Sequence, residues 1–86
     1  MRRTKKDLYE RVKLLNEILE EKGVDLQGFE YHIAERDIAT YGSNYSVALE
    51  MKKLESGATK DVTYFMSVTN LYYVINAMIG MTEYIK

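Results

Sequence analysis

The stretch YSVALEMKKLESGATKDVTYFM, residues 45–66, decides the fold because apolar and polar side chains alternate on both sides of a turn. The turn is ESGA, in which Gly57 can take a positive φ. Alternation with a period of two is typical of antiparallel strands that have one packed face and one wet face. The side chains expected to face inward are Tyr45, Val47, Leu49 and Met51 in the first strand and Val62, Tyr64 and Met66 in the second.

A third strand is predicted upstream, in FEYHIAER, residues 29–36, where Phe29, Tyr31 and Ile33 form the apolar set. The segment YGSN, residues 41–44, indicates a turn into the strand that follows it. For DIATY, residues 37–41, the pattern leaves the structure open, with an extension of the strand past a bulge as one alternative.

Helical patterns flank the strands. In TKKDLYERVKLLNEILEEKG, residues 4–23, leucines and a valine recur at spacings of three and four, with Thr4 and Asp7 as a capping box and Gly23 as the stop. A second helix begins near Ser67 or Thr69 and runs towards the C-terminus. The sequence therefore predicts one α+β domain over residues 1–86, in the order α-β-β-β-α. We expect a three-stranded antiparallel sheet with both helices on one face.

The last helix has more apolar surface than one sheet can cover. Its main stripe is expected to face the sheet and consists of Leu71, Val74, Ile75, Met78, Met81 and Ile85. One flank adds Tyr72 and Ile79, and the opposite flank carries Tyr73, Ala77, Gly80 and Tyr84 at steps of four, three and four. The first helix can cover only one flank. The flank at 73–84 is the candidate protein interface, and plain packing within the domain is the alternative.

Composition argues against several kinds of site. The chain has 86 residues, a net charge of −1, no cysteine and a single histidine, His32. A zinc site needs three or four ligands, and no second histidine or cysteine is present to accompany His32. We therefore expect no catalytic, metal or cofactor site. The longest apolar stretch is too short to span a bilayer, and the basic start lacks the apolar core of a signal peptide, so a cytoplasmic location is expected.

A basic cluster at the start of the chain is the basis of an alternative function. The cluster consists of Arg2, Arg3, Lys5 and Lys6, and these four cations could contact phosphates. The order α-β-β-β-α is also that of double-stranded RNA-binding domains. The start of the last helix, SVTNLYY, nevertheless carries no positive charge, so that likeness concerns the fold alone.

The chain resembles a group of small, mostly uncharacterised bacteriophage and prophage proteins. The resemblance lies in TKKDLYERVKLLNEIL, in YHI, in YGSNYSVALEMKKLESGATKDVT and in LYYVINAMIGMTEYI. The chain departs from the group at Ser43, where a second turn glycine is usual, and in keeping only Gly57 of a glycine run. The resemblance implies a phage or mobile-element accessory protein in a bacterial cytoplasm. With no catalytic group expected, binding to another protein is the leading hypothesis, as an inhibitor of a host enzyme or defence nuclease or as a homodimer.

Overall fold

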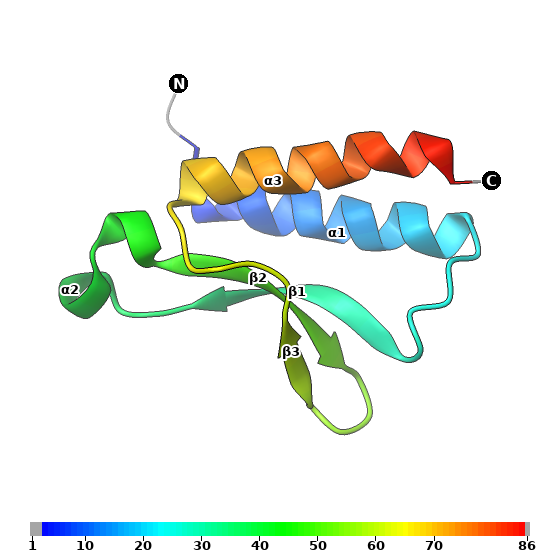
Figure 1. Ribbon diagram of the computed structural model, residues 1–86, viewed down its shortest axis with the longest axis horizontal. Coiled ribbons are helices and arrows are strands. Elements are labelled where there is room, and N and C mark those ends of the chain that lie inside the picture. Colours follow the sequence, from blue (N-terminus) through cyan, green and yellow to red (C-terminus); the bar gives the residue numbers. More distant parts are fainter. Residues whose placement is uncertain (1–2, 86) are drawn as a thin grey trace.

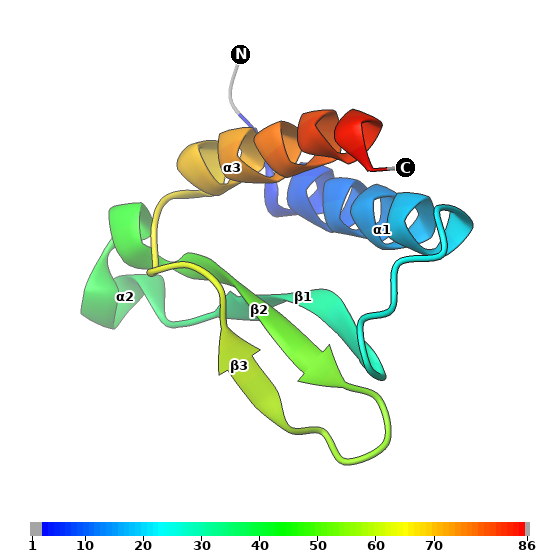
Figure 2. The same cartoon turned by 45° about the vertical axis from the view of Figure 1, so that its right-hand side comes forward.

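The computed structural model describes residues 3–85 and has an α+β fold. Three antiparallel strands in the order β1-β2-β3 form an open sheet, and both long helices lie on the same side of it (Figure 1). Figure 2 shows α1 and α3 side by side above the sheet. The predicted fold class and element order are therefore confirmed. The elements are α1 (Lys5–Glu21), β1 (Phe29–Glu35), α2 (Ile38–Tyr41), a 3₁₀ turn (Ser43–Tyr45), β2 (Val47–Lys53), β3 (Thr59–Asp61), α3 (Val68–Met81) and a 3₁₀ turn (Thr82–Tyr84).

Local signals set both ends of α1. The hydroxyl of Thr4 accepts a hydrogen bond from the N–H of Asp7, and the Asp7 carboxylate accepts one from the N–H of Thr4 at 2.9 Å. This hydrogen bond is the main reason why the pKa of Asp7 is lowered. At the other end, Gly23 has a φ of 70°, and the N–H of Val24 donates to the carbonyl of Leu19. The capping box and the glycine stop are both confirmed.

The core lies between the two helices and the sheet. Its fully buried side chains come from α1, β2 and α3 and form one cluster with Ile33 of β1. Complete burial of a leucine or isoleucine side chain stabilises the fold by roughly 1.5–3 kcal/mol. The largest of these buried apolar side chains are Leu8, Leu15, Leu49, Leu71, Ile75 and Val47.

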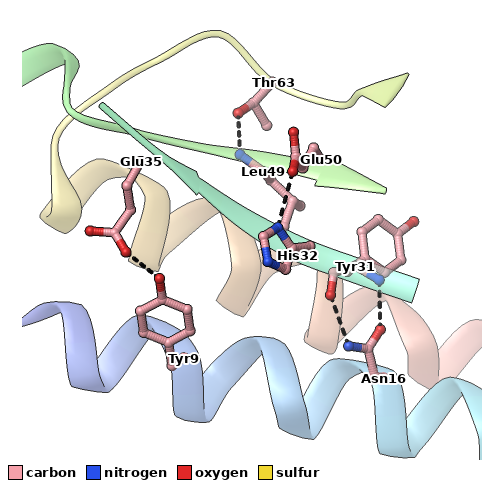
Figure 3. A network of polar contacts seen from close by, with 8 residues as sticks. All are labelled: Tyr9, Asn16, Tyr31, His32, Glu35, Leu49, Glu50 and Thr63. Carbon is pink, nitrogen blue, oxygen red and sulfur yellow. Dashed lines mark hydrogen bonds and ion pairs between the residues drawn. The ribbon is translucent and has the colours of Figure 1, made fainter. Parts of the chain in front are cut away.

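A single amide closes part of the free edge of the sheet. Asn16 of α1 accepts a hydrogen bond from the N–H of Tyr31 at 2.9 Å and donates one to the carbonyl of the same residue at 3.0 Å (Figure 3). Tyr31 lies in β1, which is an edge strand whose outward backbone groups need partners. The amide therefore fixes α1 against the sheet and satisfies a donor and an acceptor that β2 cannot reach.

The third strand is shorter than predicted because the chain bulges after Asp61. The ladder stops at Asp61 opposite Glu50 and resumes only where Met66 pairs with Val47, so two residues of β2 face four of the next segment. Within this gap the carbonyl of Leu49 accepts from the N–H groups of residues 62 and 63, and its own N–H donates to the Thr63 hydroxyl at 3.0 Å (Figure 3).

This bulge makes part of the predicted register wrong. Tyr64 and Val62 were expected to face inward, but the side chain of Tyr64 is 90% exposed and that of Val62 is also exposed. Two additional residues on one strand push the intervening side chains out of the pleat. Met66 does pack against the core, as predicted.

The segment between β1 and β2 is helical and not an extension of the strand. The carboxylate of Asp37 caps α2 by accepting from the N–H of Ala39 at 2.9 Å, and Gly42 ends the helix with a φ of 81°. Tyr45 lies in the following 3₁₀ turn and is exposed, so its predicted inward place in the sheet is wrong.

Arg36 ties this helical segment to the bulged strand. Its guanidinium lies over the ring of Tyr41 at 4.0 Å and over that of Phe65 at 3.9 Å, and its Nε donates to the carbonyl of Tyr45 at 2.8 Å. Cation–π contacts of this kind are worth about 0.5–2 kcal/mol each. Phe65, which the predicted alternation places away from the core, thus has a specific partner.

Candidate protein-binding site

The first helix covers one flank of α3. The helix begins at the N-cap Ser67, whose hydroxyl accepts from the N–H of Asn70 at 3.2 Å. Tyr72, on the flank that also carries Ile79, is 6% exposed, and the guanidinium of Arg3 lies 4.3 Å from its ring centre. The side chain of Arg11, from α1, lies near the same ring. This flank is therefore part of the packing between α1 and α3.

The opposite flank is exposed and is called the α3 face below; it consists of Tyr73, Ala77, Gly80 and Tyr84. Tyr73 is 60% exposed and Tyr84 is 79% exposed, and the two small residues between them are exposed as well. Tyr84 stands in the 3₁₀ turn that continues the helix. The structure thus brings the four predicted interface residues together on one exposed side of the helix, while their role in binding stays a prediction.

An apolar groove adjoins the α3 face. Its volume is about 590 Å³, and its walls include Leu15 and Leu19 of α1, Tyr31 of β1, and Ala77 and Met81 of α3. Met81 was expected to face the sheet, but it is 66% exposed. This prediction is therefore wrong, and Met81 lies at the border of the groove.

The groove and the α3 face form one uncharged surface. Ala77 belongs to both, and among residues 3–85 no charged side chain lines the groove. Sequence reasoning identified the face but missed the groove. Its lining residues come mainly from α1 and α3, with Tyr31 from β1, and in the sequence they have the spacing of ordinary core positions.

The single histidine lies on the opposite side of the sheet. His32 of β1 faces Glu50 of β2, with 3.0 Å between its Nδ1 and a carboxylate oxygen (Figure 3). Asp61 of β3 pairs with Glu50 from the other side. Within residues 3–85, no group of three or more histidine or acidic side chains is placed to hold a metal ion. The position of His32 is accounted for by this cross-strand pair.

The basic cluster is partly engaged by the protein itself. Arg2 lies outside the described residues. Arg3 stacks on Tyr72, and the ammonium of Lys5 lies 2.7 Å from the carboxylate of Glu35. Lys6 is exposed. Arg3 and Lys5 also line a polar cleft of about 610 Å³ between the N-terminal ends of α1 and α3.

Glu35 is the centre of a small polar network beside this cluster. Lys5 is the main cause of its lowered pKa, and the hydroxyl of Tyr9 donates a second hydrogen bond to the same carboxylate (Figure 3). The same bond raises the pKa of Tyr9 to about 12, because the carboxylate disfavours a phenolate beside it. Glu35 thus neutralises one of the cations that the alternative function would need.

Comparison with other proteins adds no relative to these observations. No helix within residues 3–85 is long and apolar enough to cross a membrane. No protein-family model matches the chain, and neither a curated protein nor a solved structure is significantly similar to it.

Proposed function

We propose that this protein works without catalysis, by binding another protein through the α3 face and the adjoining groove. The observation that carries the proposal is the continuity of the two: exposed tyrosines at 60% and 79% stand beside an uncharged groove of about 590 Å³. Depletion of charge and enrichment of tyrosine are features of the centres of protein interfaces. A helix packed beside a groove is also a common way to bind a partner segment.

The resemblance to phage proteins supplies the setting of the proposal. A phage or mobile-element accessory protein in a bacterial cytoplasm acts on host components, and blocking a host enzyme or defence nuclease requires surface and no catalytic group. The proposed role is therefore occlusion by binding.

A capture experiment tests this function. Wild-type protein, Tyr73→Glu and Tyr64→Glu are immobilised and exposed to the same bacterial lysate. Tyr64 is the matched control because it is a 90% exposed tyrosine on the bulge and outside the α3 face. We expect the wild type and Tyr64→Glu to retain the same discrete protein and Tyr73→Glu to lose it. Equal behaviour of the two variants would contradict binding through the α3 face.

Nucleic-acid binding is the second candidate. It is favoured by the cleft between two helix N-termini, which Arg3 and Lys5 line with positive charge. The ion pair between Lys5 and Glu35 reduces the positive charge that is available to bind a phosphate, so protein binding is the better supported function.

A further inference from the structure

Gly80 is a glycine that the chain itself does not require. The other four glycines have a positive φ, which favours glycine, whereas Gly80 lies within α3. A Cβ at position 80 would meet no atom within 4 Å, so no neighbour in this chain needs the space. A glycine inside a helix lowers helix stability relative to alanine. A glycine at this exposed position leaves room for another backbone to approach α3 closely.

We propose that this neighbour is a second copy of the chain, packed with its α3 antiparallel to the first about a two-fold axis; the proposal rests on the protein-binding function above. Along the α3 face the residues are spaced by four, three and four positions, and this spacing is the same when it is counted from either end of the helix. An axis level with residues 78 and 79 therefore places Ala77 opposite Gly80 of the second copy. It also places Tyr73 level with Tyr84 of that copy. A two-fold contact needs such a self-complementary surface.

The small residues stand where such a contact needs them. Ala77 and Gly80 lie at the centre, so the helix axes can approach to about 8 Å, the short end of the usual range. The tyrosines stand at the two ends, where they add contact area.

Charge and area agree with a self-contact. Close to a two-fold axis, a charged side chain lies near the same side chain of the second copy, and the two like charges repel each other. The α3 face carries no charged side chain, so this repulsion does not arise there. The protein exposes 6056 Å², whereas a monomer of its 10.0 kDa mass is expected to expose about 5200 Å². This difference is counted over the whole surface, and a standard interface buries roughly 800 Å² of each partner.

The tyrosines provide a substantial part of that area. At 60% and 79% exposure, and with about 200 Å² for a complete aromatic side chain, Tyr73 and Tyr84 together expose about 300 Å². Met81, at the border of the groove, adds to this from the same side of the helix. The α3 face is thus large enough to be the centre of a dimer contact.

Light scattering after size exclusion, across a concentration series, tests the proposal. The expected result is a mass twice the 10.0 kDa of the chain for the wild type and for Tyr64→Glu. Gly80→Lys is expected to weaken dimerisation by at least about 30-fold, the effect of losing one interface hot spot. Gly80→Ala is expected to change two quantities in opposite directions. The unfolding midpoint measured at low protein concentration rises, because alanine has a higher helix propensity than glycine. The affinity of the dimer falls, because the added methyl group enters the contact.

The outcomes separate this proposal from the function on which it rests. A wild-type monomer whose α3 face still captures a different protein overturns the second copy and leaves the binding function standing. A monomer that captures nothing overturns both. A dimer that Gly80→Lys leaves intact overturns the contact through α3.

Discussion

The amide of Asn16 allows a sharp test of how α1 is attached to the sheet. Replacing it in Asn16→Leu keeps the shape of the side chain and removes both hydrogen bonds to Tyr31, at 2.9 and 3.0 Å. The N–H and the carbonyl of Tyr31 are then left without this partner at a part-buried edge. Each lost bond costs roughly 1–1.5 kcal/mol of stability, or about 2–3 kcal/mol for the pair.

The difference in helix propensity reduces this loss. Leucine has a higher helix propensity than asparagine, which returns about 0.5 kcal/mol, so the expected net loss is about 2 kcal/mol. In a chain of this length that loss lowers Tm by about 8–16 °C. The assay is urea unfolding followed by circular dichroism at a protein concentration held constant, with the midpoint and the slope both fitted.

Glu17→Leu is the control because Glu17 is an exposed neighbour on the same helix. Its expected change is within about 0.5 kcal/mol. If Asn16→Leu is no less stable than this control, the amide does not hold the edge of the sheet and the reasoning is refuted.

Three further predictions concern the polar network, the bulge and the basic cluster. Because the pKa of Glu35 is lowered in the folded state, chiefly by Lys5, its contribution to stability is present above the ordinary value of 4.5 and lost as the pH falls through the lowered pKa. Thermal melts from neutral to acid pH should therefore show Glu35→Gln as less stable at neutral pH and equal to the wild type in acid; a constant difference would contradict the network. Thr63→Val should cost about 1–2 kcal/mol in urea unfolding, because the N–H of Leu49 loses its hydroxyl partner, and an unchanged midpoint would show that the bulge does not depend on it. If the nucleic-acid alternative holds, RNA or DNA should shift in a gel in a salt-dependent way, and no shift at low salt would dispose of it. The shift should vanish on neutralising Arg2, Arg3, Lys5 and Lys6.

Both ends of α1 and the start of α3 could be predicted from the sequence because their signals are local, whereas α3 was expected to run to the C-terminus and ends at Met81. Thr4, Asp7 and Gly23 act on backbone groups within a few residues, and so does Ser67. The alternation in β1 and β2 was equally readable, because it reflects one packed face. These features do not depend on what lies elsewhere in the chain.

The bulge and α2 could not be predicted because they depend on contacts between distant residues. Thr63 takes the place of a backbone acceptor for Leu49, and Arg36 holds Phe65 from a turn that precedes β2. Neither contact leaves a periodic signal. Alternation alone therefore continued the strand through the exposed Tyr64 as far as Met66.

The candidate site was half predictable. Periodicity identified two apolar flanks on the last helix and only one helix to cover them. Which flank is covered depends on how α1 lies, and the stacking of Arg3 on Tyr72 shows the outcome. The groove beside Met81 leaves no separate signal in the sequence, because its lining residues have the spacing of core positions.

Disulfide formation between engineered cysteines tests the central claim, that a second copy covers the α3 face. The chain has no cysteine, so Ala77→Cys and Gly80→Cys each introduce a single thiol. The two-fold arrangement predicts that a mixture of these variants forms a disulfide between positions 77 and 80 faster than either variant pairs with itself. Tyr64→Cys sets the background rate for an exposed thiol. A mixed disulfide that forms no faster than this background, or a preference for pairing within one variant, would contradict the antiparallel dimer.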